Sequence, residues 1–265
     1  MPKSGRGRGT VADQRARQRV IRDYVLAAGS ISVEDIAQHT GVSTMTVYRD
    51  LADLEPSGVL RLSRGMVTAA ASNLHEASSG YRLTRESAEK ASLAQAALQF
   101  VEPGSAVMLD DSSTGVHLAR LLPQRAPLTV VTNYQPVAEL VKEEQNIRLI
   151  LTGGEYRAWA DAVMGPMTVK AVRTLRADAA FMSVSALYDG RCFHPTEEPA
   201  EVKRAMMASS MFKVLYVDHT KFSRAALHEV GSVRDFDVVI VDQATTAQHV
   251  ATIEDAGVRV VRAEP

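Results

Sequence analysis

A chain of 265 residues can form two domains, and with 46% hydrophobic and 23% charged residues its composition is that of a globular protein rather than a disordered or fibrous one. The single cysteine, Cys192, excludes an intrachain disulfide and a thiolate zinc cluster, which favours a cytoplasmic location. No stretch is apolar over a length that could span a bilayer, and the basic first residues lack the apolar run of a secretory signal.

The net charge of −1 is unevenly distributed along the chain. Residues 1–75 contain ten Lys or Arg against seven Asp or Glu, whereas residues 76–265 contain twenty against twenty-four. Most of the early basic residues precede or line a predicted helix over residues 12–28, and Arg15 and Arg19 are among them. A basic helix of this kind suits contacts with DNA phosphates, although a solvated tail has the same composition. We expect residues 1–11 to be disordered.

Residues 33–62 have the pattern of a helix-turn-helix. Gly41 suits the positive φ of a break between two helices, and Ser43 or Thr44 can cap the second one. Apolar residues recur at helical spacing on the side that faces the core: Ile36, Ala37, Val47, Leu51 and Leu54. Hydroxyl groups, an aromatic ring and an arginine remain for the other side: Ser43, Thr44, Thr46, Tyr48 and Arg49. These side chains suit a major groove, but similar helix pairs also occur in domains that contact only protein.

Residues 60–68 read as two short strands around Gly65, with Arg64 at the tip, and predict a wing. Residues 1–68 are thus expected to form a winged helix-turn-helix domain. Residues 69–81 are small and polar without periodicity, which predicts a linker.

Residues 82–265 are expected to form a second, α/β domain. A predicted helix over residues 84–101 is followed by six short apolar runs, VML, LTVVT, IRLILT, AAFMSV, KVLYV and DVVIV, which alternate with helical segments. Such runs are buried on both faces, and the alternation predicts an open, mostly parallel sheet with helices on either side. Ligands of these sheets bind at the carboxyl ends of the strands.

Polar residues gather at those predicted strand ends. The candidate effector-binding residues are Asp110, Ser112, Ser113, Thr114, Thr132, Asn133, Gly153, Gly154, Glu155, Lys203 and Lys221. The hydroxyls before the helix that starts near residue 116 indicate an anion site at a helix N-terminus, and the simpler alternative is an ordinary cap. The glycine pair indicates either a tight turn or a close approach by a ligand. Asp110 and Asp111 suit sugar hydroxyls. No histidine stands at metal-ligand spacing, so we expect neither a metal nor a cofactor.

Over nearly its whole length the chain resembles the DeoR-type bacterial transcriptional regulators. The N-terminal resemblance is carried by VEDIAQHTGVSTMTVYRDLADLEPSGVLRLSRG, and the C-terminal one by LDDSSTG, VVTN, TGGEYR, EVKRAMMASS and YVDHTKF, all in order. The resemblance implies a sensor fold shared with ribose-5-phosphate isomerase and glucosamine-6-phosphate deaminase. Tyr48 stands where the family commonly has a second arginine, Arg64, Gly65 and Met66 replace a glycine pair, and Ser112 replaces the usual glycine of the phosphate loop.

The resulting hypothesis is a DNA-binding repressor of a carbohydrate uptake or catabolism operon, controlled by a phosphorylated sugar. Two operator half-sites would require a homo-oligomer, a dimer or a tetramer, and no membrane partner is expected. The alternative is a sugar-phosphate isomerase or deaminase fused to a DNA-binding module, with Asp110 or Asp218 as general base and Lys221 as electrostatic stabiliser. The fold alone does not decide between them.

Overall fold

The computed structural model describes residues 11–28, 30–57, 60–69, 76 and 79–264. The chain divides into two compact units, residues 1–72 and 73–265. Within the described ranges, no helix is both long and apolar enough to cross a membrane. Apart from Val11, the residues expected to be disordered lie outside the described ones.

The N-terminal unit contains three helices and a small antiparallel sheet. Its elements are α1 (Val11–Ala28), β1 (Ser30–Ser32), α2 (Val33–Thr40), α3 (Thr44–Leu54), η1 (Glu55–Ser57), β2 (Leu60–Ser63) and β3 (Met66–Ala69). The strands lie in the order β1-β3-β2. Ile21, Ile36, Val47 and Leu51 are fully buried, so the apolar stripes of all three helices form one core. The predicted winged helix-turn-helix is confirmed, while β1, which is too short to show a pattern, was not predicted.

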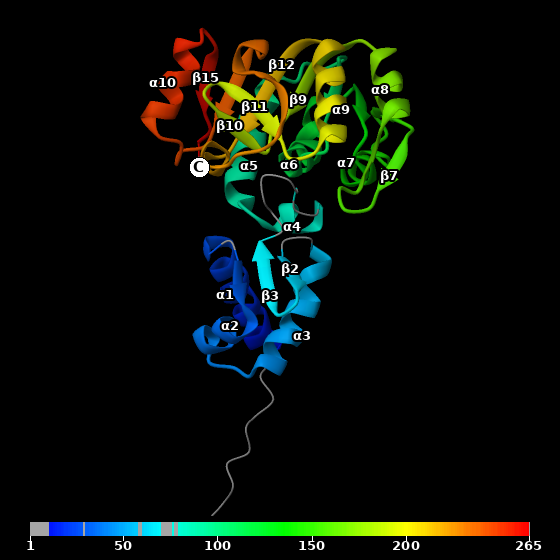
Figure 1. Cartoon of the computed structure of the whole chain (residues 1–265). Coiled ribbons are helices and arrows are strands. Elements are labelled where there is room, and N and C mark those ends of the chain that lie inside the picture. The colour runs from blue at the N-terminus through cyan, green and yellow to red at the C-terminus, as the bar shows by residue number, and fades with distance from the viewer. Residues whose placement is uncertain (1–10, 29, 58–59, 70–75, 77–78, 265) are drawn as a thin grey trace, which may run out of the picture. The chain divides into compact units, whose positions relative to one another are not determined.

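The C-terminal unit is built on a seven-stranded parallel sheet (Figure 1). Its strands are β4 (Ala106–Leu109), β5 (Leu128–Thr132), β6 (Ile147–Leu151), β9 (Ala177–Met182), β12 (Ser210–Val217), β14 (Val238–Val241) and β15 (Arg259–Arg262). They lie in the order β15-β14-β12-β9-β4-β5-β6, and each pair is parallel. This confirms the predicted open α/β fold. Strand β15 was missed because it lies at an edge and has arginine at both ends, which leaves only a two-residue apolar run.

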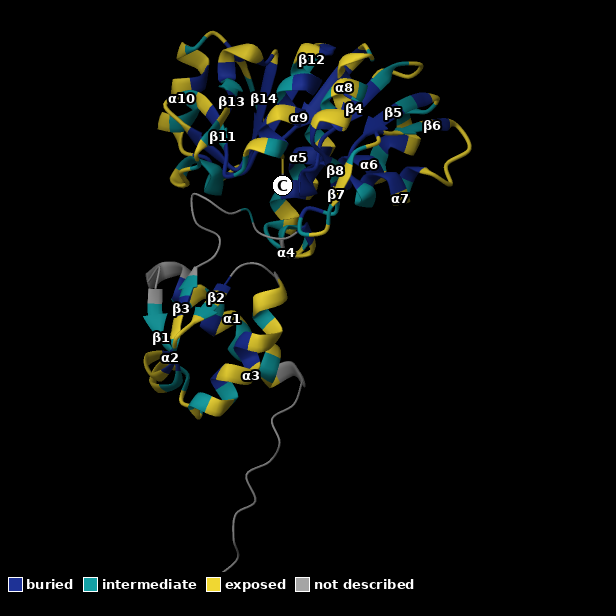
Figure 2. Ribbon diagram, turned by 45° about the vertical axis from the view of Figure 1, so that its right-hand side comes forward, coloured by how far each residue is buried: buried dark blue, intermediate teal, exposed yellow. Residues whose placement is uncertain are grey.

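Helices cover both faces of this sheet. One face packs against α5 (Ser87–Ala97), α6 (Ser113–Leu121) and α7 (Gln135–Val141), and the other against α8 (Pro166–Arg173), α9 (Glu197–Ala208) and α10 (Ala247–Asp255). Alternate residues of each strand feed the two cores: Val107 and Leu109 of β4 enter the first, whereas Met108 enters the second. Figure 2 shows these strands buried between exposed helix surfaces.

Smaller antiparallel pieces complete the unit, and none was predicted. Strands β7 (Glu155–Arg157) and β8 (Ala162–Met164) form a hairpin, and β10 (Ala186–Tyr188), β11 (Arg191–His194) and β13 (His228–Ser232) form a separate sheet. Short 3-10 turns lie at η2 (Leu98–Phe100), η3 (Leu122–Arg125), η4 (His219–Ser223) and η5 (Val233–Asp235).

The helix predicted over residues 84–101 is wrong in its extent. Two helices, α4 (Ser79–Thr84) and α5, are separated at Glu86, whose φ of 47° is left-handed. The buried Lys90 ammonium stabilises this break, because it donates to the carbonyl oxygens of Arg82 (2.6 Å) and Arg85 (2.5 Å). Helix α4 overlaps the predicted linker but packs in the C-terminal unit, where Ser79 N donates to Trp159 O at 2.8 Å.

Candidate DNA interface and effector site

The two helices of the helix-turn-helix are held at their ends by local hydrogen bonds. Ser32 caps α2 by accepting from Asp35 N at 3.0 Å, and Gly41 ends that helix with a φ of 69°. Ser43 then caps α3, where its Oγ accepts from Thr46 N at 3.3 Å and lies 3.0 Å from Thr46 Oγ1. The hydroxyl of Ser43 is therefore used to start the helix.

The outer side of α3 is open to solvent. Met45 is 71% exposed and Tyr48 38%, and Arg49 is also exposed and forms no ion pair with any described residue. Thr44 and Thr46 are half-buried beside them. A solvent-facing arginine next to hydroxyls and an aromatic ring is free to meet base edges or phosphates.

The basic residues of α1 separate into two kinds. Arg17 makes a bidentate ion pair with Asp50 of α3, with Nε–Oδ2 and Nη2–Oδ1 distances of 2.5 and 3.1 Å, and Arg22 pairs with the neighbouring Asp23. Arg15 and Arg19 are exposed and have no ion pair among the described residues. The charge of Arg17 therefore fastens α1 to α3, whereas Arg15 and Arg19 remain available to a partner.

The wing ends in a tight turn with an arginine at its tip. Arg64 and Gly65 both have positive φ, 49° and 76°, and Arg64 is exposed. Arg61 on β2 is a second exposed basic residue of the wing, which the sequence analysis did not select.

In the C-terminal unit the direction of the strand order reverses between β4 and β9. From β4 the chain adds β5 and β6 on one side of the sheet, and then β9, β12, β14 and β15 on the other. The loops that leave β4 and β9 diverge at such a point, and open α/β sheets bind ligands there. Asp110 follows β4 and Ser183 follows β9, and Ser183 N donates to Asp110 Oδ2 at 3.0 Å.

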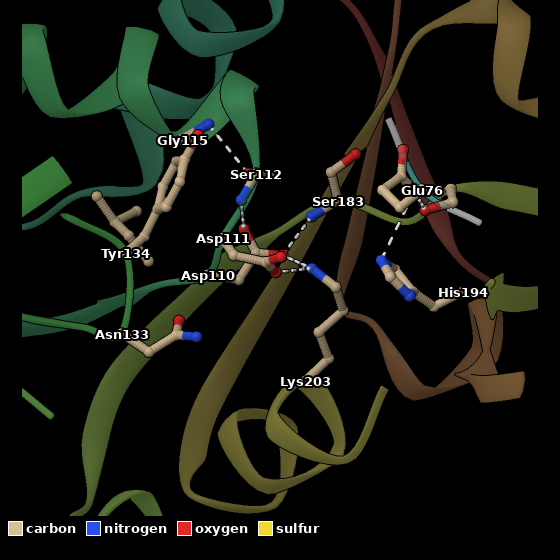
Figure 3. A network of polar contacts seen from close by, with 12 residues as sticks. Glu76, Asp110, Asp111, Ser112, Gly115, Asn133, Tyr134, Ser183, His194 and Lys203 are labelled. Atoms are coloured by element: carbon tan, nitrogen blue, oxygen red, sulfur yellow. Dashed lines mark hydrogen bonds and ion pairs between the residues drawn. The ribbon is translucent and has the colours of Figure 1, made fainter. Parts of the chain in front are cut away.

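A buried lysine completes the bonding of the loop after β4 (Figure 3). Lys203 Nζ of α9 lies 2.5 Å from Asp110 Oδ2 and 2.9 Å from Asp111 Oδ1, and all three residues are at most 3% exposed. Burial alone lowers the pKa of Lys203, but the two carboxylates raise it above its usual value. Asp110 Oδ1 also accepts from Ser112 N at 3.2 Å. Asp110 and Lys203 therefore have protein partners of their own.

Of the three hydroxyls at the start of α6, only one is used by the protein. Ser112 Oγ accepts from Gly115 N at 3.1 Å and lies 3.2 Å from Tyr216 Oη, so it is the helix cap. The hydroxyls of Ser113 and Thr114 form no hydrogen bond with described residues, although both residues are buried. The cap of α6 therefore does not use them.

At the ends of β5 and β6, too, some polar groups have hydrogen-bond partners in the protein and others have none. Thr132 Oγ1 donates to Leu109 O at 2.8 Å and accepts from Tyr134 N at 3.1 Å. Asn133 Nδ2 donates to Val163 O at 3.0 Å, but its Oδ1 is buried without a partner. Thr152 Oγ1 is also buried without a partner.

The glycine pair of the third strand end is explained in part by packing. Gly154 has a φ of 151°, and a Cβ there would lie 2.8 Å from Met164 O and would overlap Thr168 Oγ1. Thr168 Oγ1 itself donates to Gly153 O at 2.8 Å. Gly153 has open space around it, and Glu155 pairs with Arg157 at 2.7 Å and is exposed.

Lys221 and Asp218 lie together after β12. Lys221 Nζ is 3.7 Å from Asp218 Oδ2, and burial lowers the pKa of Lys221. Asp218 Oδ1 accepts from Thr220 N at 3.0 Å. Burial raises the pKa of Asp218, but Lys221 and Thr220 bring it below its usual value.

Arg82 of α4 is a site residue that the sequence did not identify. Its Nη1 donates to Asp111 O at 2.8 Å, whereas its Nε and Nη2 are buried without hydrogen-bond partners, as is Asp111 Oδ2. Nothing in the local sequence marks this arginine, because it stood between the predicted linker, residues 69–81, and the predicted helix over residues 84–101.

A winged helix-turn-helix followed by a parallel α/β unit with unused polar groups at its switch point defines a class, the ligand-responsive DNA-binding regulators. Two family models match the chain: the DeoR-like helix-turn-helix domain over residues 17–73 and the DeoR C-terminal sensor domain over residues 85–243. The chain belongs to the DeoR family of transcriptional regulators.

Two individual relatives agree with this assignment. The glycerol-3-phosphate regulon repressor of Escherichia coli (strain K12) is 28% identical over 86% of this chain and 91% of its own length. The lactose phosphotransferase system repressor of Staphylococcus epidermidis is 30% identical over 84% and 89%. Among solved structures, ribose 5-phosphate isomerase A of Methanocaldococcus jannaschii is similar over 50% of this chain and 53% of that one, with 15% identity and a TM-score of 0.38.

Proposed function

We propose that this DeoR-family regulator represses a carbohydrate uptake or catabolism operon and that a phosphorylated sugar bound at the β4/β9 switch point controls its affinity for operator DNA. The observation that carries the proposal is the set of buried polar atoms without hydrogen-bond partners on Arg82, Asp111, Asn133 and Thr152. Two of these atoms, Arg82 Nη2 and Asp111 Oδ2, form only a long ion pair with each other, at 3.9 Å. Leaving such groups unpaired costs about 1–3 kcal/mol each, which a ligand that pairs with them would recover.

The unpaired groups divide into donors for an anion and partners for hydroxyls. Arg82 Nε and Nη2 and the free hydroxyls of Ser113 and Thr114, at the N-terminus of α6, suit a phosphate group. Asp111 Oδ2, Asn133 Oδ1 and Thr152 Oγ1 suit sugar hydroxyls.

Other predicted effector residues receive supporting roles in this proposal. The polar groups of Asp110, Ser112, Thr132 and Lys203 already pair with the protein, so these residues shape the loops rather than meet the effector. Lys221, whose ion pair among the described residues is the 3.7 Å contact with Asp218, is the second cation for the phosphate.

The N-terminal unit is the proposed operator reader. Thr44, Thr46, Tyr48 and Arg49 would enter the major groove, Arg15 and Arg19 would contact phosphates, and Arg64 would reach the backbone or minor groove from the wing. Ser43 supports α3 rather than reading bases, because its hydroxyl caps the helix.

The surroundings of the two candidate general bases, Asp110 and Asp218, disfavour an isomerase or deaminase activity. Asp110 is paired with Lys203 and two backbone amides. The lowered pKa of Asp218 makes that carboxylate a weak proton acceptor. We propose that the site binds its ligand without turning it over, and a coupled assay with aldose and ketose phosphates should show no turnover above background.

Operator selection tests the DNA half of the proposal. The full chain is used to select duplexes from a random library, and binding is then measured for wild type and Arg49→Ala. Arg49→Ala should weaken specific binding by about 1–3 kcal/mol if it reads a base, or reduce the salt slope by about one if it meets a phosphate. Unchanged binding for Thr46→Ala, Tyr48→Ala and Arg49→Ala together contradicts the placement of α3.

The effector half is tested on the same complex. A thermal-shift panel compares each phosphorylated sugar with its unphosphorylated form, and only phosphorylated members should stabilise the protein. The one that does should change operator affinity, and operator should change its affinity by the same factor. A panel without any phosphate-dependent stabilisation overturns the proposed effector class.

A further inference from the structure

Glu76 is a carboxylate that the proposed effector site does not account for. It lies four residues after Ser72, the last residue of the DNA-binding unit, and its side chain is only 7% exposed within the sensor unit. A charged side chain is seldom buried so close to a domain boundary unless other groups hold it there.

Two side chains of the sensor contact this carboxylate. Ser185 Oγ donates a hydrogen bond to Glu76 Oε2, and His194 Nε2 lies 3.6 Å from the same oxygen (Figure 3). The other ring nitrogen, His194 Nδ1, lies 3.1 Å from Thr196 N and 3.0 Å from Thr196 O, so the backbone of Thr196 holds the ring with Nε2 facing Glu76. Ser185 lies on the loop after β9, two residues beyond the Ser183 that donates to Asp110, and His194 ends β11 of the separate antiparallel sheet.

The positive charge near Glu76 comes from the cations assigned to the effector phosphate. Burial raises the pKa of Glu76, but His194, Arg82 and Lys221 bring it down to about 2. Burial also lowers the pKa of His194, so the imidazole is mostly neutral at pH 7 and Arg82 and Lys221 supply the lasting charge. Glu76 acts in turn on the pKa of both cations.

Glu76 leaves part of the hydrogen-bonding capacity of these cations unused. Among the described residues no hydrogen bond joins it to Arg82, and Arg82 Nε and Nη2 have no hydrogen-bond partner, although Nη2 lies 3.9 Å from Asp111 Oδ2. A phosphate that paired with them would bring a second negative charge into a region where Glu76 is already desolvated, and two like charges in one buried site destabilise each other. The cations can therefore favour either anion strongly, but not both at once.

We propose that the Glu76 carboxylate and the anionic group of the effector compete for Arg82 and Lys221, so that effector binding and the docking of Glu76 in the sensor exclude each other. This inference rests on the proposed effector site. Because Glu76 is joined to the DNA-binding unit by a few residues, its docking and release provide a covalent route from the effector to that unit. The effector shifts the equilibrium between docked and undocked Glu76 only as far as it binds the undocked state more tightly than the docked one.

Inorganic phosphate is the probe for this competition, measured by calorimetry on the full chain. Glu76→Gln removes the competing charge and should bind phosphate about 5- to 150-fold more tightly than wild type, the range of an ordinary coupling. Glu102→Gln makes the same change on an exposed residue of the same unit and should leave the affinity unchanged.

Ser185→Ala tests whether Glu76 is displaced when phosphate binds, as opposed to Glu76 only repelling the phosphate charge. It is also the variant to use if Glu76→Gln does not fold. It removes the hydrogen bond that holds Glu76 and leaves every charge in place. If Glu76 must leave, phosphate should bind Ser185→Ala more tightly than wild type. If Ser185→Ala binds phosphate no better than wild type, the exclusion is overturned.

The remaining outcomes also distinguish this inference from the proposed function. If phosphate binds wild type and Glu76→Gln equally while phosphorylated sugars still stabilise the protein, the competition is overturned and the effector site stands. If neither phosphate nor any phosphorylated sugar binds any of these proteins, the inference and the proposed effector class both fail.

Discussion

Single hydroxyl groups show the difference between a residue that supports the sensor and one that faces a ligand. Thr132 ends β5, Thr152 directly follows β6 of the same sheet, and both are buried. The hydroxyl of Thr132 has two backbone partners, whereas that of Thr152 has none. The same substitution should therefore have opposite consequences at the two positions.

Thr152→Val should leave the free energy of unfolding unchanged or slightly higher, because it replaces an unpaired buried hydroxyl with a methyl group of similar size. It should weaken effector binding by about 1–2 kcal/mol through the lost hydrogen bond. Thr132→Val is the control, and it should lower the free energy of unfolding by about 1–3 kcal/mol, since it leaves Tyr134 N without a partner. Thermal unfolding with and without effector measures both. A stable Thr132→Val beside an unstable Thr152→Val would reverse the assignment.

The arginines of α1 allow a similar comparison for the DNA-binding unit. Arg17→Met leaves the carboxylate of Asp50, which is 1% exposed, without its ion pair and should lower the free energy of unfolding by about 3 kcal/mol. Arg19→Met changes an exposed residue of the same helix and should alter stability by less than about 0.5 kcal/mol, while reducing the salt dependence of DNA binding. Urea unfolding followed by circular dichroism measures the difference. Equal stability of the two variants would mean that the Arg17–Asp50 pair does not fasten α1 to α3.

At the scale of elements, the turn between β6 and β7 depends on one glycine of its pair. Gly154→Ala should lower the free energy of unfolding of the sensor unit by about 2–4 kcal/mol, because the added Cβ meets Met164 O and Thr168 and the positive φ is strained. Gly153→Ala should be tolerated within about 0.5 kcal/mol, since nothing lies within 4 Å of its Cβ position. Chemical unfolding of the two single variants checks this. If both variants lose the same stability, packing does not explain the pair.

Helix α4 and the break at Glu86 form the element that joins the proposed site to the preceding chain. Lys90 holds the carbonyl end of α4, Ser79 N holds its start against Trp159 O, and Arg82 extends from it to Asp111. A change at Arg82 on effector binding would therefore reach the segment that contains Glu76. A continuous helix through this region, as the apolar pattern predicted, would lack this separately anchored turn.

At the scale of the whole molecule, a single winged unit reads only a short DNA site, and specific affinity ordinarily requires two half-sites. We predict a homo-oligomer, a dimer or a tetramer, assembled through the sensor unit. Light scattering of the full chain at the concentration that binds operator should give a mass of at least two chains. A monomer under those conditions contradicts the prediction.

Hydropathy pattern and turn residues in the sequence were enough to predict two units, the helix-turn-helix with its Gly41 break and the parallel sheet with polar residues at its strand ends. These features depend on the spacing of apolar residues and on backbone preferences, and both can be read from residues that are close together in the sequence. Strands β13 and β15 were not predictable in this way, because long-range pairing holds them. The short hairpins and the break at Glu86, which the Lys90 side chain stabilises, leave no periodicity in the sequence.

Only the tertiary structure decided which polar residues are already paired. Asp110 meets Lys203 across 93 positions of sequence, Arg82 meets Asp111 across 29, and Ser185 meets Glu76 across 109. Whether a carboxylate or hydroxyl supports the fold or remains free for a ligand depends on these distant partners. Residue type and spacing alone could place the site at the strand ends, but could not divide its residues between structure and binding.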